Sequence, residues 1–271
     1  MTDSTARMPV AFVPHGGGPW PFVEMGLPPG EIEDLKRYLQ SVRTLPTLTP
    51  RALLVVSAHW EEAVPTVMAA DHPPMLYDYY GFPPESYRLT WPAPGDPQLA
   101  AEVAALLEQA QFQTRSDPAR GFDHGAFVPL KVTYPDADVP AIQLSLVSGL
   151  DPAHHLAIGR ALAPLRDRNV FIIGSGMTFH NLRAFGDPRA AGSSELFDDW
   201  LRGVMERDPA DRARGLAGWS KAPAARIAHP REEHLIPLMV ATGAASEDAA
   251  TLAFNGTFGG TRLSAYHFGG R

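Results

Sequence analysis

Five apolar runs rich in β-branched residues recur along the chain and limit the folds that it can adopt. They are "PVAFV" (9–13), "ALLVVSA" (52–58), "VPAIQLSLV" (139–147), "VFIIGSG" (170–176) and "TLAFNG" (251–256). Several are apolar at nearly every position, which is typical of strands covered on both faces. Helical patterns lie between them at 96–110, 151–165 and 232–245, and residues 186–231 hold further helices. We therefore expect an α/β fold in which helices flank both faces of a mostly parallel or mixed sheet.

The chain shows no internal repeat and no shift in composition, so we expect residues 1–271 to form one domain. Segment 71–97 interrupts the alternation of strands and helices, because it is rich in Pro, Gly and aromatic residues. A long loop of this kind more often covers a site than links domains. Its aromatic side chains either line a site for a ring or pack over the sheet edge; they are Tyr77, Tyr79, Tyr80, Phe82 and Trp91.

Charge and composition exclude several classes of protein. The formal net charge is −7 and the basic residues form no run, so we expect no nucleic-acid partner and no anionic membrane partner. No apolar stretch is long enough to cross a bilayer or to serve as a secretion signal, and the cytoplasm is the expected location. Because the chain has no cysteine, any metal must be held by His, Asp or Glu.

Five of the ten histidines occupy related positions. His15 ends the first apolar run, His59 ends the second, and His180 follows the fourth through a glycine turn. His124 in "GFDHGAF" opens a helix, and His234 in "HPREEHLIPL" lies near the start of another. In an open α/β sheet the loops at the carboxyl ends of the strands converge and form ligand sites. We therefore expect these five imidazoles to meet in one cleft.

The remaining histidines have weaker cases for a functional role. A single histidine after a strand is more often a hydrogen-bonded loop residue than a metal ligand, so only the gathering of several favours a metal site. His154 and His155 are adjacent in a helix, and we expect them on a solvated face. His72, His229 and His267 are expected to be structural, with His267 in a C-terminal strand and with His72 and His229 as reserve candidates for the lining of the site.

The glycine-rich motifs suggest other functions that the sequence does not support. "HGGG" (15–18) is similar to the oxyanion loop of some α/β-hydrolases, but those enzymes also need a G-x-S-x-G nucleophile elbow, and "IIGSGMT" does not supply one. Ser175 is therefore a poor nucleophile candidate. Neither G-x-G-x-x-G nor a Walker A pattern is present, which argues against a nucleotide site. We expect the glycines after His15 to permit a tight turn and to leave the metal face uncrowded.

Imidazole ligands without thiolate suit iron, zinc, copper or nickel. A histidine-rich set with open positions suits a non-heme Fe(II) that acts on oxygen, and three protein ligands with one water suit a catalytic zinc. His15, His59 and His234 would satisfy either metal. His124 and His180 would then take up and return protons near neutral pH, since free imidazole has a pKa of about 6.5. A zinc-dependent hydrolase thus stays open beside an iron oxygenase.

Six segments together resemble the DOPA 4,5-dioxygenase branch of the class III extradiol ring-cleaving dioxygenases. In chain order they are "FVPHGGGPW", "LLVVSAHWE", "DHGAFVPLKVTYPDADVPAIQLSL", "IIGSGMTFHNLRAF", "EEHLIPLMVATGAA" and "SAYHFG", and they span nearly the whole chain. The resemblance implies a LigB-like α/β fold, a mononuclear Fe(II), and cleavage of a DOPA-like catechol by O2 beside its two hydroxyls. Zinc is the alternative metal in the isolated protein, and a homo-oligomer stays open.

The resemblance also implies a role for each histidine. The implied metal ligands are His15, His59 and His234, with Glu233 as the reserve candidate for the third place. His180 is implied as the catalytic base, or as a further ligand when zinc is bound, and His124 as a group that contacts substrate or oxygen. A non-catalytic LigB-like binding protein is the remaining alternative, although such a protein would have no chemical reason to keep the histidine set.

Overall fold

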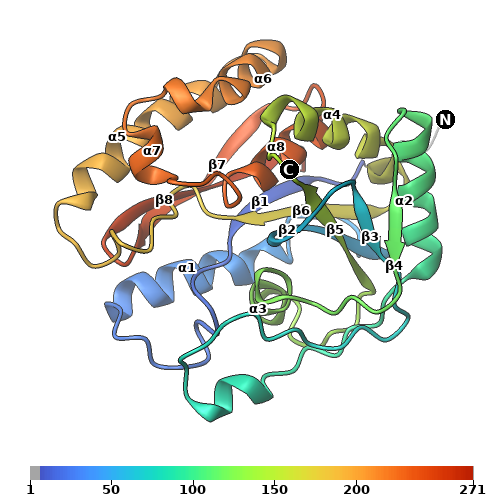
Figure 1. The fold of residues 1–271 in the computed structure, drawn as a ribbon, viewed down its shortest axis with the longest axis horizontal. Helices are drawn as coiled ribbons and strands as arrows, with labels where there is room; N and C mark the ends of the chain where they lie inside the picture. The colour runs from blue at the N-terminus through green and yellow to red at the C-terminus, as the bar shows by residue number, and fades with distance from the viewer. Residues whose placement is uncertain (1–6, 271) are drawn as a thin grey trace.

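One mixed sheet of eight strands runs through residues 7–270, which are the residues that the computed structural model describes (Figure 1). The strands are β1 (Val10–Pro14), β2 (Ala52–Glu62), β3 (Thr66–Met68), β4 (Arg115–Asp117), β5 (Ala141–Val147), β6 (Val170–Gly176), β7 (Ala250–Phe258) and β8 (Thr261–Phe268). Their order across the sheet is β4-β3-β5-β2-β6-β1-β8-β7. All five predicted strands are present and the expected α/β class is confirmed. That residues 1–271 form one domain stays a prediction, and residues 1–6 and 271 lie outside the described residues.

The centre of the sheet is parallel and antiparallel pairs lie on either side of it, while β3 and β4 at one margin pair in parallel again. Strands β5, β2, β6 and β1 pair in parallel, whereas β3 with β5, β1 with β8 and β7 with β8 pair antiparallel. Every residue of β1 and of β6 is buried, which explains why these strands read as continuous apolar runs. The carboxyl ends of β1, β2 and β6 consequently lie together at one edge of the sheet.

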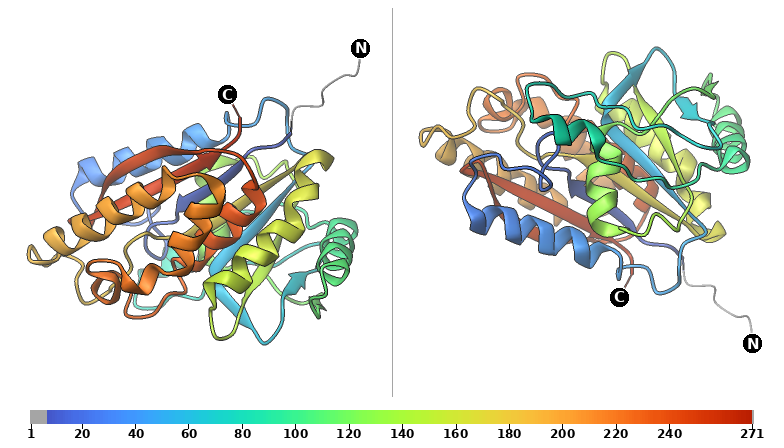
Figure 2. Two further views of the ribbon diagram at one scale, coloured as in Figure 1. Left: turned by 90° about the horizontal axis from the view of Figure 1, so that it is seen from above. Right: turned by 90° about the horizontal axis from the view of Figure 1, so that it is seen from below.

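Helices cover both faces of the sheet (Figures 1 and 2). On one face lie α1 (Pro29–Val42) and α3 (His124–Thr133), which are in front of the sheet when it is seen from below in Figure 2. The opposite face carries α4 (Pro152–Leu162), α8 (Ile236–Ala245), α5 (Ala190–Met205), α6 (Pro209–Ala217) and α7 (Ala225–Ala228), while α2 (Pro97–Gln109) packs beside β3 and β4. Three short 3-10 segments are η1 (Pro84–Arg88), η2 (Ala163–Arg168) and η3 (Trp219–Lys221). No helix within residues 7–270 has both the length and the apolar character that a membrane span requires.

Two of the three predicted helix starts follow the capping signals of the sequence. Asp96 accepts a hydrogen bond from the Leu99 N–H at 2.8 Å and caps α2, and Asp151 caps α4 in the same way. The helix predicted over 232–245 begins only at Ile236. Residues 232–235 form a separate turn, in which the Leu235 N–H donates to the Glu232 carbonyl at 2.8 Å, so His234 lies before the helix.

Candidate metal centre

Five imidazoles converge at the carboxyl edge of the central strands. The ring centroid of His15 lies 4.9 Å from that of His59, 5.6 Å from His124 and 5.2 Å from His234. The rings of His59 and His124 are 3.9 Å apart, and His180 stacks on His234 at 3.3 Å. The structure therefore brings together the five histidines that the sequence singled out, while their individual roles stay predictions.

The turn after β1 directs His15 into this cluster. The His15 N–H donates to the Gly176 carbonyl at the end of β6, at 3.2 Å. Gly16 follows with a φ of +76°, and a Cβ at this position would lie 2.5 Å from the Trp20 ring. A glycine is thus required both for the left-handed turn and for the close packing of Trp20.

An irregularity in β2 places His59. The register of β2 against β5 shifts between Val56 and Glu61, and a bulge of this kind changes the direction of the side chains within it. Helix α3 then approaches closely, because a Cβ on Gly125 would lie 2.5 Å from Ser57 Oγ and 2.8 Å from His59 Cδ2. The absence of a side chain at Gly125 lets the first turn of α3, which begins at His124, pack directly against His59.

His180 and His234 arrive from two loops that the end of β6 holds together. The Met177 N–H donates to the His234 carbonyl at 2.9 Å, and the His180 N–H donates to the Ala228 carbonyl at 2.9 Å. These backbone bonds fix both loops against the sheet edge. The two histidines are therefore positioned by the main chain as well as by the contact between their rings.

Hydrogen bonds to the outer side of three rings decide which nitrogen carries the proton. The Ser175 hydroxyl donates to the Gly125 carbonyl, so its oxygen accepts from His15 Nδ1 at 3.1 Å. His124 Nδ1 lies 2.8 Å from Asp78 Oδ1, and His234 Nδ1 lies 2.9 Å from Glu233 Oε1. An ionised carboxylate only accepts.

In each of these rings Nδ1 therefore holds a hydrogen and Nε2 faces the cluster, where that of His15 lies 3.2 Å from His59 Nε2. A hydrogen bond to the outer nitrogen that fixes the tautomer in this way is typical of histidines that bind metals. Ser175, which the sequence excluded as a nucleophile, thus has a different part in the site, since it sets the tautomer of His15.

Burial keeps the central imidazoles neutral. Desolvation, together with the charges of neighbouring histidines, lowers the pKa of His15 and of His234 well below the usual 6.5 and lowers the pKa of His59 to about 3. Burial works to raise the pKa of Asp78 and of Glu233, but hydrogen bonds and charges from the adjacent histidines outweigh it, so both pKa values lie below their usual range. As a result, the imidazoles of His15, His59 and His234 are neutral, and the Asp78 and Glu233 carboxylates beside the cluster are ionised.

We expect the metal-free protein to lose stability steeply below pH 6.5. His15, His59 and His234 stay neutral in the folded protein but take up protons in the unfolded chain, where their pKa is near 6.5. The stabilisation is complete above pH 6.5 and is lost as the pH falls toward the folded pKa, at up to about 1.4 kcal/mol per pH unit for each histidine. Urea unfolding at pH 7.5, 6.5 and 5.5 measures the effect, and a free energy of unfolding that is constant over this range contradicts it.

Two groups of side chains in residues 7–270 have ligand atoms within 4.8 Å of one another, the spacing that a metal needs. The first is His15, His59 and His124; the second is His180, Glu233 and His234. The rings of His15, His59 and His234 are also neighbours, at 4.8 to 5.2 Å. Neutral imidazoles whose Nε2 atoms face one another at a buried point fit a divalent transition metal, and the cluster can therefore hold one.

The other histidines lie outside the cluster, and one sequence expectation is wrong. His155 is buried rather than on a solvated face, and its Nε2 accepts the Val147 N–H at 3.0 Å. Helix α4 packs against α8 and α2, and the adjacent His154 is half-buried. His229 is also buried and its Nε2 lies 2.9 Å from the Thr178 carbonyl, while His267 contacts the Tyr38 hydroxyl at 3.0 Å and His72 is exposed.

Loop 71–97 contacts the cluster chiefly through two residues. Tyr79 is buried and its ring lies 5.7 Å from that of His124, whereas Trp91 is buried elsewhere and donates to the Tyr134 carbonyl. Tyr80 is 90% exposed. The aromatic side chains therefore serve mainly as packing, with Tyr79 beside the site. Asp78, the residue of this loop with the closest contact to His124, had no signal in the sequence.

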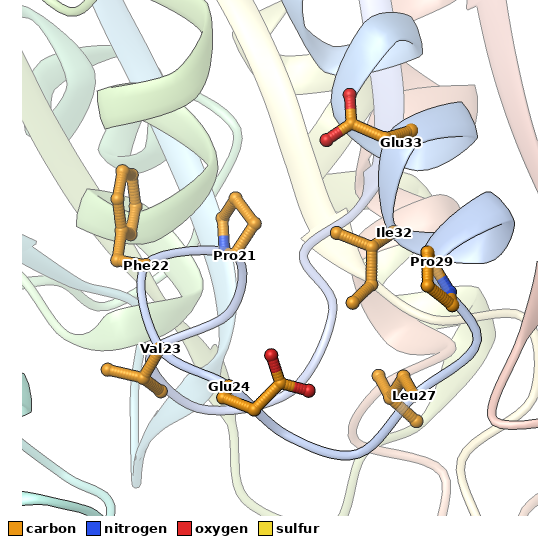
Figure 3. A pocket seen from close by; sticks show the side chains of 8 residues that line it. All are labelled: Pro21, Phe22, Val23, Glu24, Leu27, Pro29, Ile32 and Glu33. Atoms are coloured by element: carbon orange, nitrogen blue, oxygen red, sulfur yellow. The ribbon is translucent and has the colours of Figure 1, made fainter.

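Two hollows can be compared with the cluster. The first, of about 340 Å³, lies between the loop after Trp20 and the start of α1, and its lining includes the carboxylates of Glu24 and Glu33 but no histidine (Figure 3). The second, of about 400 Å³, is lined by His180 and Glu233 together with Arg183 and Arg231. The second hollow adjoins the histidines and is the candidate entrance for a substrate.

The comparisons with known proteins identify the family of the chain. A family model described as the catalytic LigB subunit of aromatic ring-opening dioxygenase matches residues 11–269. The chain belongs to this family, and its enzyme class is that of the extradiol ring-opening dioxygenases.

Individual proteins are similar to the chain over most of its length. The chain is 38% identical over 280 residues to dioxygenase tasH of Hapsidospora irregularis, covering 97% of this chain and 86% of that protein. It is 40% identical over 249 residues to the 4,5-DOPA dioxygenase extradiol of Beta vulgaris, covering 88% and 91%. A crystal structure of an uncharacterized protein from Escherichia coli K12 superposes with a TM-score of 0.78 at 30% identity and covers 97% of this chain and 100% of that one.

Proposed function

We propose that the protein is an Fe(II)-dependent extradiol dioxygenase that uses O2 to open the ring of a DOPA-like catechol. The observation that carries the proposal is the cluster of five imidazoles in which outer partners engage Nδ1 of His15, His124 and His234 and leave Nε2 to the cluster. Relatives named 4,5-DOPA dioxygenase extradiol at 34 to 41% identity support the choice of substrate. A cytoplasmic location and a homo-oligomer stay predictions.

The proposed ligands are His15, His59 and His234. The Nε2 atoms of His15 and His59 lie 3.2 Å apart, and the His234 ring is adjacent to both. Glu233, the reserve candidate, is a poor third ligand because its carboxylate oxygens already contact other groups. These are His234 Nδ1 at 2.9 Å and Arg231 Nη1 at 3.4 Å. Iron suits an oxygenase, since zinc has no redox chemistry.

Two further histidines would move protons beside these ligands. When bound, the metal supplies Lewis acidity toward the two catechol oxygens and electron transfer toward oxygen. His180 stacks on His234 and its Nδ1 lies 3.5 Å from Glu233 Oε1, and it is the proposed base that accepts a proton from a catechol hydroxyl. His124, with Nδ1 held by Asp78, presents Nε2 toward substrate or oxygen and is placed to return a proton during ring opening. Burial of the cluster excludes bulk water.

Protein loaded anaerobically with Fe(II) is expected to consume O2 when a catechol is added and to form a coloured ring-fission product. An oxygen electrode together with absorbance spectra checks this across a panel of catechols, with DOPA included. The matched control is resorcinol, whose hydroxyls are not adjacent and which therefore cannot chelate one metal. Stoichiometric iron without oxygen uptake for any catechol contradicts the proposal.

The alternatives are separated by the same preparation. A zinc hydrolase would be active with zinc and inactive with iron, and a non-catalytic binding protein would bind a catechol without turnover. Family membership and the complete histidine cluster favour the dioxygenase over both.

A further inference from the structure

Asp78 makes three contacts with histidines of the cluster. Its Oδ1 accepts the backbone N–H of His124 at 2.9 Å and lies 2.8 Å from Nδ1 of the same residue. Its Oδ2 lies 3.6 Å from His59 Nδ1. Within the described chain, the only ion pairs of Asp78 are with these two imidazoles. The carboxylate therefore has no arginine or lysine to neutralise it and faces the cluster alone.

One oxygen that accepts from both the backbone and the ring of His124 restricts the side chain to a single orientation. Because an ionised carboxylate only accepts, the hydrogen must reside on Nδ1. The remaining nitrogen, Nε2, then carries the lone pair and is the one available to the cluster. Without the carboxylate an imidazole can exchange its two tautomers and rotate about χ2.

We propose that Asp78 is a positioning residue that fixes the tautomer and orientation of His124 for proton transfer, and that it steadies His59 through its second oxygen. This role rests on the proposed function of His124. Asp78 acts through the imidazole and does not touch the substrate. It reaches the cluster from loop 71–97, so this loop contributes to the site by a carboxylate as well as by covering it.

A purely structural role for Asp78 is disfavoured by the contacts around it. Helix α3 already has its own cap, because Asp123 Oδ1 accepts the Ala126 N–H at 3.2 Å. The loop is independently attached, since the Leu76 N–H donates to the Phe122 carbonyl at 2.7 Å and the Trp91 indole N–H donates to the Tyr134 carbonyl at 2.7 Å. Neither helix nor loop needs the Asp78 carboxylate to keep its place.

The test compares Asp78→Asn with Asp71→Asn, a matched control in the same loop whose carboxylate is 73% exposed and contacts only the exposed His72. We expect Asp78→Asn to lower kcat about 10- to 100-fold while KM changes less than twofold and the bound iron stays stoichiometric. Asp71→Asn should match the parent protein. A change in KM with kcat unchanged, or equal kcat values for Asp78→Asn and Asp71→Asn, overturns the proposal.

A second readout does not depend on turnover. In the metal-free and Zn(II)-loaded forms, ¹⁵N NMR of the imidazoles reports which nitrogen of each ring is protonated, and the His124 signals are assigned by their loss in His124→Gln. We expect His124 to carry its hydrogen on Nδ1 in the parent and to shift toward the Nε2–H tautomer in Asp78→Asn. A parent spectrum with the hydrogen on Nε2 overturns the proposal even if the variant does not fold.

The two readouts also distinguish this inference from the function on which it rests. If no catechol supports oxygen uptake, the dioxygenase proposal fails, while the tautomer of His124 still decides whether Asp78 orients it. If oxygen uptake is present and the tautomer is insensitive to Asp78→Asn, the dioxygenase stands and the positioning role is wrong.

Discussion

His59→Ala is expected to remove bound iron and turnover together, whereas His180→Ala keeps most of the iron and loses turnover. His59 Nε2 lies 3.2 Å from His15 Nε2 at the centre of the cluster, so the substitution removes one of the three proposed ligands. His59→Ala should lower iron affinity by more than the roughly 10- to 100-fold that is lost when a residue hydrogen-bonded to a metal ligand is removed. His180 contributes proton transfer, so its removal should lower kcat by about 10²- to 10⁴-fold.

Iron content by plasma emission spectrometry and oxygen uptake under saturating catechol separate the two effects. His72→Ala is the matched control, because the His72 side chain is 87% exposed and contacts only Asp71. It should change neither quantity. Equal loss of iron in His180→Ala and His59→Ala would show that His180 is a ligand, as it would be if zinc filled the site with four histidines.

The central strands were predictable from sequence because burial on both faces leaves a continuous apolar run, as in β1 and β6. The margin formed by β3 and β4 was not predictable in the same way. Strands β3 and β4 have three residues each, which is too short for any periodicity to be detected, and β4 is the polar sequence Arg-Ser-Asp. Helix α1 is not among the predicted helices, although Pro29 stands in its first turn and the buried Leu35 and Leu39 are four residues apart, as on one face of a helix.

The convergence of the histidines was predictable because the carboxyl ends of parallel strands meet whatever the intervening loops do. The groups that orient them were not, since they depend on loop geometry. Asp78 lies in an irregular segment where sequence spacing says nothing about direction, and Glu233 was considered only as a ligand, whereas its carboxylate faces His234 Nδ1. The sequence motif around Ser175 bears only on a role as nucleophile, whereas in the structure its hydroxyl orients His15.

Beneath the cluster, a buried carboxylate connects the strands to α3. Asp123 is fully buried, and its oxygens accept from Ser57 Oγ at 2.7 Å, Arg120 Nη2 at 2.8 Å and Gln143 Nε2 at 2.8 Å. These partners come from β2, β5 and the segment before α3. Ser57 Oγ in turn accepts the His59 N–H at 3.2 Å, so the network extends to a proposed metal ligand.

Asp123→Ala is therefore expected to lower the free energy of unfolding by about 3–5 kcal/mol, because it leaves the Arg120 guanidinium, the Gln143 amide and the Ser57 hydroxyl without their acceptor. Urea unfolding of the metal-free protein at pH 7.5 measures the loss. The control is Asp136→Ala, whose carboxylate is 71% exposed beside Arg43 and should change stability by less than about 0.5 kcal/mol.

The effect of Asp123→Ala should also reach the metal, which distinguishes the network from an ordinary buried ion pair. Once Ser57 Oγ is released from Asp123, it no longer holds the His59 N–H in one place, and the bulge in β2 that directs His59 loses its support. We expect iron affinity to fall about 10-fold in the folded fraction of Asp123→Ala, as for other outer partners of metal ligands. Unchanged iron affinity alongside the loss of stability would show that Asp123 supports only the fold, whereas a stability loss below about 1 kcal/mol would show that water replaces the carboxylate.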